Sequence, residues 1–142
     1  MKTPAQIIAD HYLIAALWAD SPEGTNPRET RQAKRKALRI AFDFLDLIAG
    51  NDIIPRVIEC HNESGYGAHP DCGNDQPWFA AMGHDLWLTS QGHGTGFCDR
   101  DELTPDLRDK LTQYAERFSH VYPEFYRGWL YLHGNDVLSV KG

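Results

Sequence analysis

The sequence predicts an α+β fold in which a small antiparallel sheet of hairpins packs with about three helices. Two observations carry this prediction. Three segments repeat apolar residues at helical spacing and open with a capping residue and a proline, whereas the segments after residue 84 alternate around glycine-rich turns. With 142 residues, 42% of them hydrophobic and 24% charged, the chain (1–142) is expected to form a single domain with its own core.

The first helix is expected from Pro4 to Ala19. Thr3 supplies a capping hydroxyl, and the proline after it suits the first helical position, where its missing N–H costs nothing. Gln6 stands three residues after the cap, as in a capping box. The apolar stripe of this helix is expected at Ile7, His11, Ile14 and Trp18, with Ile8, Tyr12 and Ala15 beside it.

Two further helices are expected to begin in the same way, at Asn26-Pro27 and at Thr104-Pro105. The second is expected to run from Pro27 to Ala49 and to end at Gly50. Its buried side should carry Ala37, Ile40, Ala41, Phe44 and Ile48. The third should bury Leu107, Leu111, Ala115 and Phe118.

Between the second and third helices, the stretch IIPRVIEC (53–60) is interpreted as a short edge strand. Residues 61–77 are then expected to form a long polar loop, which is a candidate insertion, and loops of this length are often functional. Further strands are expected at 84–90 and 95–100, and at WLYLH and VLSV around the turn Gly134-Asn135-Asp136.

The stretch HDLWLTSQGHGTGFCDR (84–100) is interpreted as a hairpin that turns at Gly92-His93. In this register Asp85 lies across from Arg100, and a slip by one residue would place Asp85 against Asp99. The inward residues would be Leu86, Leu88 and Phe97, and the outward residues Asp85, Trp87, Thr89 and Arg100. An outward Trp87 is either a binding residue or, as is more common for tryptophan, covered by another element.

The polar and aromatic residues of this hairpin make it the predicted binding surface. Its candidate residues are His84, Asp85, Trp87, Thr89, His93, Asp99 and Arg100. Tyrosine, tryptophan and arginine are favoured at interface hot spots, and the aromatic run HVYPEFYRGWLY further along offers more of them. The simpler alternative is that at least half of those aromatics pack a helix against the sheet.

The stretch 83–100 resembles a signature, GHDFWLTRNGHGAGFWDR, of a family of small uncharacterised proteins encoded by bacteriophages and prophages. Leu86 stands where the signature has phenylalanine, and Cys98 where it has tryptophan. Two more segments resemble that family, YLIAALWAD near the N-terminus and WLYLHGNDVLSV near the C-terminus. The residues that fit the signature are Gly83, His84, Asp85, Trp87, Leu88, Thr89, Gly92, His93, Gly94, Gly96, Phe97, Asp99 and Arg100. The resemblance implies a phage origin and a shared fold, and it implies no chemistry.

Composition sets limits on the partners and the compartment. The net charge of -6 disfavours nonspecific binding to nucleic acid, although six cations lie close together in residues 28–39. That basic segment either touches an anionic partner or is a solvated helix face. Three cysteines suit a reducing compartment, and neither a secretory leader nor a membrane span is expected, so the protein is placed in the cytoplasm of an infected or lysogenic bacterium.

Three functions remain open from the sequence. The leading hypothesis is a non-enzymatic, phage-encoded accessory protein that binds a host or phage macromolecule through the hairpin 84–100, with a protein as the expected partner. The first alternative is a metal-dependent hydrolase or nuclease that uses histidine, aspartate and cysteine residues, and the second is a protein that binds a small molecule or nucleotide. No cofactor is expected. Zinc is a further possibility, with Cys60, His61, His69 and Cys72 as its ligands, although their spacing lacks the short paired pattern of strong zinc motifs.

Overall fold

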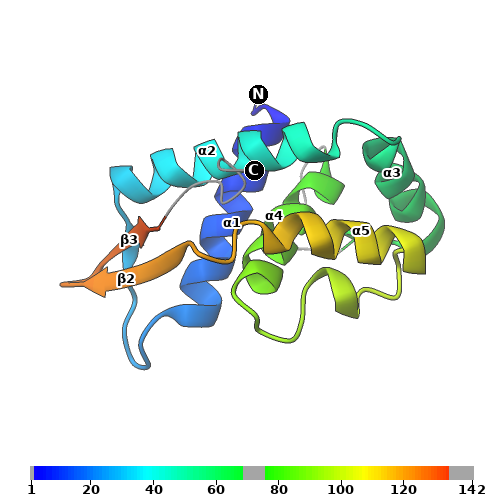
Figure 1. The fold of residues 1–142 in the computed structure, drawn as a ribbon. Coiled ribbons are helices and arrows are strands. Elements are labelled where there is room, and N and C mark those ends of the chain that lie inside the picture. The colour runs from blue at the N-terminus through cyan, green and yellow to red at the C-terminus, as the bar shows by residue number, and fades with distance from the viewer. Residues whose placement is uncertain (1, 69–75, 135–142) are drawn as a thin grey trace.

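The computed structural model describes residues 2–68 and 76–134 (Figure 1). In these ranges the chain is mostly helical, and its small sheet is mixed, so the expected sheet of antiparallel hairpins with about three helices is wrong. The fold remains α+β in the broad sense. In chain order the described elements are α1 (Pro4–Asp20), β1 (Arg28–Glu29), α2 (Arg31–Ile48), α3 (Ile53–Ser64), α4 (Pro77–Ser90), the short 3-10 helix η2 (Phe97–Asp99), α5 (Pro105–Glu116), β2 (Tyr122–Tyr126) and β3 (Trp129–His133).

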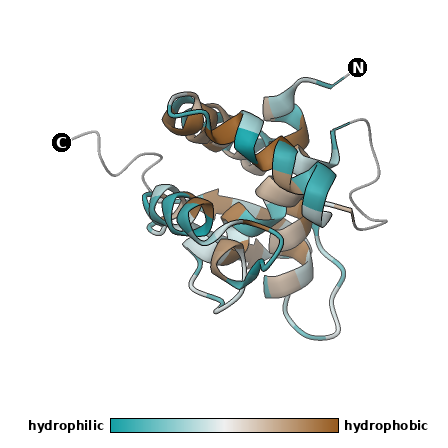
Figure 2. Ribbon diagram, turned by 90° about the vertical axis from the view of Figure 1, so that its right-hand side faces the viewer, coloured by the Kyte–Doolittle hydropathy of each residue, from teal (hydrophilic) through white to brown (hydrophobic). Residues whose placement is uncertain are grey.

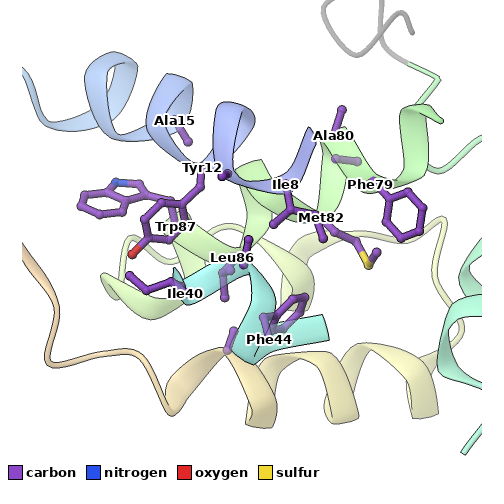
Figure 3. Close-up of a cluster of buried hydrophobic side chains, with 14 of the residues drawn as sticks. Ile8, Tyr12, Ala15, Ile40, Phe44, Phe79, Ala80, Met82, Leu86 and Trp87 are labelled. Carbon is purple, nitrogen blue, oxygen red and sulfur yellow. The ribbon is translucent and has the colours of Figure 1, made fainter. Parts of the chain in front are cut away.

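Helices α1 and α4 pack against each other at the centre of the molecule. Their close approach depends on Gly83, because a Cβ there would overlap the carbonyl oxygen of Ile8. Trp87 is fully buried in the same interface and meets Tyr12 edge to face, with 5.1 Å between ring centroids. Figure 3 shows these side chains within one apolar cluster, together with residues of α2 such as Phe44. Helix α4 is therefore a core helix.

Helices α2 and α5 enclose this central pair, and α3 lies at one end (Figure 1). The five apolar residues expected to be buried on α2 are all buried, and so are the four expected on the third helix, α5, and just beyond it. Figure 2 shows hydrophilic and hydrophobic residues on different sides of the helices, as expected where each helix turns one side to a shared core.

The sheet is small and lies at the end of the helical body opposite α3 (Figure 1). Its strand order is β1-β3-β2, with β1 parallel to β3 and β2 antiparallel to it. Strands β2 and β3 join through the two-residue turn Arg127-Gly128, in which both residues have positive φ, as a type I′ turn requires. Leu130 and Leu132 are buried on the inner face. The sheet thus has one face on the core and one face outward.

Of the three expected helix starts, two are confirmed and one is wrong. The starts at Thr3 and Thr104 are confirmed, and in both the threonine side chain accepts a backbone hydrogen bond from the first turn. The start at Asn26-Pro27 is wrong, because Thr30 caps α2 instead and residues 28–29 form β1. In α1, the expected stripe is partly wrong, since Ile14 and Trp18 are exposed.

The predicted hairpin 84–100 is wrong. Residues 84–90 complete α4, and residues 97–99 form η2. The predicted inward residues Leu86, Leu88 and Phe97 are nevertheless buried, whereas Trp87 and Asp85 are buried as well instead of facing outward. The hydrogen bonds that hold the backbone are those of a helix, so the alternation that a strand requires does not apply.

The predicted strand 53–60 is also wrong, since these residues belong to α3. Pro55 is its third residue, in the first turn, where a missing N–H is tolerated. Of the expected loop 61–77, residues 61–64 belong to α3 and Pro77 begins α4, while residues 69–75 lie outside the described residues. The strand WLYLH is confirmed as β3, but its described antiparallel partner is β2, and the predicted strand VLSV lies outside the described residues.

Candidate functional site

A buried ion pair joins α4 to the segment that follows η2. The Asp85 side chain is 1% exposed, and its carboxylate accepts hydrogen bonds from Arg100 at 2.6 and 3.0 Å on Oδ1 and at 3.1 Å on Oδ2. Tyr66 Oη donates to Oδ2 as well, at 2.7 Å. The sequence predicted that Asp85 and Arg100 meet, and they do so through an ion pair between a helix and a loop, not across a β ladder.

Protonation of this pair depends on both partners. Burial raises the pKa of the Asp85 carboxyl above its usual range, while the hydrogen bonds from Arg100 and Tyr66 act in the opposite direction. The hydrogen bond to Asp85 also raises the pKa of the Arg100 guanidinium, which therefore stays charged. Removing Arg100 would leave Asp85 with the cost of burial and little to offset it.

Asp85 and Arg100 form the floor of an open cleft of about 840 Å³. The cleft lies between α1, α4 and the residues that follow α3 and η2. Trp18 and Ile14 line it from α1, and their side chains are 73% and 49% exposed. The Trp18 ring lies against the His84 ring, with 5.9 Å between centroids. Its full lining is His11, Ile14, Trp18, Gly65, Tyr66, Gly67, Ala68, Ala81, His84, Asp85, Arg100 and Glu102.

The two charged groups at the floor of the cleft differ in their free hydrogen-bonding capacity. Both oxygens of Asp85 are already bonded, so this carboxylate is not available to take a proton from a substrate. Arg100 Nη1, in contrast, makes no hydrogen bond within the described residues, and the Arg100 side chain is 33% exposed. The cleft therefore presents an apolar rim at Trp18 and Ile14 and a cationic donor at Arg100.

The other predicted binding residues have structural contacts instead of a place in the cleft. Trp87 Nε1 donates to Asp20 Oδ2 at 2.6 Å, and His93 Nε2 lies 3.0 Å from the same oxygen. Thr89 Oγ1 accepts a hydrogen bond from the Phe97 amide at 3.1 Å. These contacts fix the end of α4 to the end of α1 and to η2.

Gly96 and Asp99, two other residues of the predicted hairpin, also lie outside the cleft. Gly96 has φ of +105°, and a Cβ there would overlap Thr89 Oγ1, so the chain can pass α4 this closely only with glycine. Asp99 is exposed in η2 and does not line the cleft. Of the seven predicted binding residues, His84, Asp85 and Arg100 meet in the cleft.

The predicted zinc ligands are only partly described. His61 Nδ1 lies 2.6 Å from the Tyr66 carbonyl oxygen, Cys60 is buried, and His69 and Cys72 lie outside the described residues. Within residues 2–68 and 76–134, no three His, Cys, Asp or Glu side chains gather closely enough to hold a metal ion. In the same ranges, no helix has the length and apolar content needed to cross a membrane.

Sequence reasoning missed Tyr66 and the role of the α1 residues. Trp18, Ile14 and His11 were assigned to the buried stripe of the first helix, and a tryptophan near the polar end of that helix was the available signal for an exposed site. Tyr66 lies in the segment interpreted as a polar loop, where a lone aromatic residue was the only sign of a buried anchor.

Comparison with known proteins adds no further assignment at this site: the chain matches no protein-family model, no curated protein and no solved structure.

Proposed function

We propose that this chain is a non-enzymatic accessory protein that binds a segment of a partner protein in the cleft between α1 and α4. The observation that carries the proposal is the position of Trp18. A tryptophan with 73% of its surface exposed stands at the rim of a cleft whose floor is the Asp85–Arg100 ion pair. Exposed tryptophan and a nearby arginine are the residues that dominate binding energy at protein interfaces.

The construction of the cleft also supports binding over catalysis. The hydrogen bonds among Asp85, Arg100 and Tyr66 fix the floor of the cleft, and a preorganised site loses less free energy on binding. The apolar rim suits an apolar side chain of the partner, and the remaining donors of Arg100 suit a backbone carbonyl or a carboxylate beside it. The partner's segment would thus be recognised by one apolar and one polar group.

The resemblance of residues 83–100 to a phage protein family directs the search for the partner to bacterial proteins in the cytoplasm. The test is affinity capture from a bacterial lysate with three forms of the chain. These are the wild type, Trp18→Ala, and Phe42→Ala, whose side chain is 54% exposed on α2 and serves as a matched exposed aromatic. A partner that is recovered with the wild type and Phe42→Ala, and is lost with Trp18→Ala, supports the proposal.

A photo-crosslinking residue at position 14 then identifies the bound segment, because Ile14 lines the cleft and is exposed. Equal recovery of the same proteins by all three forms would contradict a role for the cleft. So would crosslinks at position 14 that are unaffected by the Trp18→Ala change. Thermal unfolding of each form confirms that the exposed substitutions leave the fold intact.

A small-molecule ligand is the second candidate, and the volume of the cleft favours it. About 840 Å³ falls within the range of roughly 300–1,000 Å³ typical of small-molecule pockets. A ligand that binds there would raise the midpoint of thermal unfolding of the wild type and of Phe42→Ala, and would do so less in Trp18→Ala. A metal-dependent hydrolase remains a sequence hypothesis, and elemental analysis of protein purified without chelator tests it.

A further inference from the structure

The outer face of the sheet is an exposed row of aromatic side chains. Alternate residues of β2 and β3 point to this face, and the register pairs Tyr126 with Trp129 and Tyr122 with His133 across the strands. Tyr122, Tyr126 and Trp129 are 56%, 52% and 45% exposed. The outward residues of the two strands are Tyr122, Glu124, Tyr126, Trp129, Tyr131 and His133.

Two arginines border this aromatic row. Arg28 of β1 is in register with Trp129, so its side chain points to the same face of the sheet. Arg127 stands in the β2–β3 turn with its guanidinium 5.2 Å from the centre of the Tyr126 ring. It has a φ of +52°, a conformation that is unfavourable for any residue except glycine or, to a lesser degree, asparagine and aspartate. The fold thus holds a cation at the tip of the aromatic row.

The basic N-terminal half of α2 lies next to the part of β3 that β1 leaves unpaired. Thr30 donates to the Leu130 carbonyl, Gln32 exchanges hydrogen bonds with Leu132, and Lys36 donates to the Gly134 carbonyl at 2.6 Å. The residues between these contacts, Arg31, Lys34 and Arg35, are exposed. A band of positive charge on β1 and α2 therefore lies at the same end of the molecule as the aromatic row.

Arg28, Arg31, Lys34 and Arg35 form no ion pair within the part of the chain that the structure describes. Residues 28–39 contain six cations and one carboxylate, although the whole chain has a net charge of -6. Such a separation of charge favours an anionic ligand at this end of the molecule and repels anions elsewhere.

The size of the aromatic face decides between classes of partner. Five residues along each long strand and two strand spacings give a face of roughly 17 Å by 10 Å, or roughly 170 Å². A standard protein interface buries about 800 Å² on each partner, which is several times more. Two or three stacked bases of a single strand need no more than this, and sheets with exposed aromatics bind single-stranded RNA in this way.

We propose that the outer face of the sheet binds single-stranded nucleic acid, with bases stacked on Trp129, Tyr126 and Tyr122 and phosphates on the arginines and lysines beside them. A duplex hides its bases from aromatic side chains, so it would meet only the cations and the acidic remainder of the protein. The negative net charge that disfavours nonspecific binding to a duplex is therefore compatible with a single strand confined to this one face. This site is separate from the α1–α4 cleft.

The test is fluorescence anisotropy with a labelled oligothymidylate, an oligouridylate and a duplex of the same length, at about 50 mM and about 200 mM salt. Binding of the single strands is expected, with the duplex weaker. If four phosphates are neutralised, affinity should fall about 50-fold between the two salt concentrations. Trp129→Ala and Tyr126→Ala should each weaken binding by about tenfold, while Trp129→Phe, which keeps a stacking ring, should retain most of it.

Three controls make the result specific. Phe42→Ala removes an equally exposed aromatic from α2 and should bind as the wild type does. Glu124→Gln removes a carboxylate from the face, where it now contacts His133 at 2.6 Å, and should strengthen binding. Lys34→Ala combined with Arg35→Ala should lower the dependence on salt.

Two outcomes would overturn the proposal. One is that neither single strand binds at about 50 mM salt. The other is that binding occurs but is unchanged in Trp129→Ala, or is matched by the duplex or by a polyglutamate competitor, since the face would then act as a simple cationic patch. Trp18 lies in the α1–α4 cleft, so Trp18→Ala should leave oligonucleotide binding unchanged. The two proposals can therefore fail independently of each other.

Discussion

Two regions of this molecule occupy environments opposite to those that their compositions suggest. The stretch from His84 to Arg100 is rich in polar residues and glycines, yet Asp85 and Trp87 are among its most buried side chains. The β2–β3 pair is rich in tyrosine and tryptophan, yet it exposes most of them. Polar groups that satisfy one another can hold a core together, and aromatic residues without a covering element remain on the surface.

The comparison separates structural from binding residues. In the first region the buried polar side chains have partners within the fold, as Trp87 has Asp20 and Asp85 has Arg100. Next to the second region, the cations Arg28 of β1 and Arg31 and Lys34 of α2 have no carboxylate partner among the described residues. The polar stretch 84–100 thus serves mainly to stabilise the fold. The proposed binding surfaces are the α1–α4 cleft, which borders this stretch, and the outer face of the sheet.

Replacing one tryptophan in each region gives the largest expected contrast. Trp87→Ala removes a fully buried ring, its edge-to-face contact with Tyr12 and its hydrogen bond to Asp20, so the free energy of unfolding should fall by about 3–5 kcal/mol. Trp129→Ala should change it by less than about 0.5 kcal/mol. Urea unfolding measures both, and similar losses for the two variants would show that the two environments do not differ as described.

Breaking the buried ion pair should have the next largest effect. Arg100→Ala leaves the Asp85 carboxylate buried with Tyr66 as its remaining described partner, which should cost about 3 kcal/mol of unfolding free energy. The expected value is at the lower end of the usual range because the Arg100 side chain is one third exposed. Arg100→Ala with Asp85→Asn should recover part of the loss, since the buried charge is then gone.

No recovery in the double variant would mean that the Arg100 side chain stabilises the protein through packing and not through its charge. The comparison is made by urea unfolding at neutral pH, with the single Asp85→Asn variant measured in parallel.

Gly83 is packed against α1 and Gly50 has open space around it, so replacing each by alanine compares a tightly packed site with an open one. Alanine in place of a helical glycine normally stabilises a protein by about 1 kcal/mol, but Gly83→Ala should destabilise this one by about 1–3 kcal/mol because its Cβ meets the Ile8 carbonyl. Gly50 has open space around it, so Gly50→Ala should be neutral or slightly stabilising. Thermal unfolding midpoints that move in the same direction for both would contradict the tight α1–α4 contact.

The sequence predicted α1, α2 and α5 as helices, but it predicted most of α3 and the second half of α4 as strands. Helix α2 repeats its buried residues at helical spacing, so its core side could be predicted even though its start was placed four residues early. Helix α4 is buried on several sides, so its apolar residues show no period, and the turn at Gly92-His93 favoured a hairpin. Pro77 at its first position was the signal that went unused.

The site was predictable only in part, for a related reason. The pairing of Asp85 with Arg100 was found because opposite charges attract in either geometry, whereas the cleft is assembled from α1, α4 and Tyr66, which are distant in the sequence. Short apolar runs such as residues 53–60 fit a strand or a helix equally well until tertiary contacts decide. A single sequence gives no direct information about those tertiary contacts.

The smallest expected effect belongs to a surface ion pair outside both regions. Arg56 Nη2 donates to Asp106 Oδ2 at 2.8 Å and lowers the pKa of that carboxyl below its ordinary value of 3.8. A lowered pKa in the folded state means that the pair stabilises the protein above the ordinary pKa, and that this contribution is lost as the pH falls through the lowered value. Asp106→Asn should therefore reduce stability slightly at neutral pH and not at all at a pH below the lowered pKa. Urea unfolding of the wild type, Arg56→Gln, Asp106→Asn and the double variant measures the coupling, and a coupling that persists in acid would assign it to packing instead of charge.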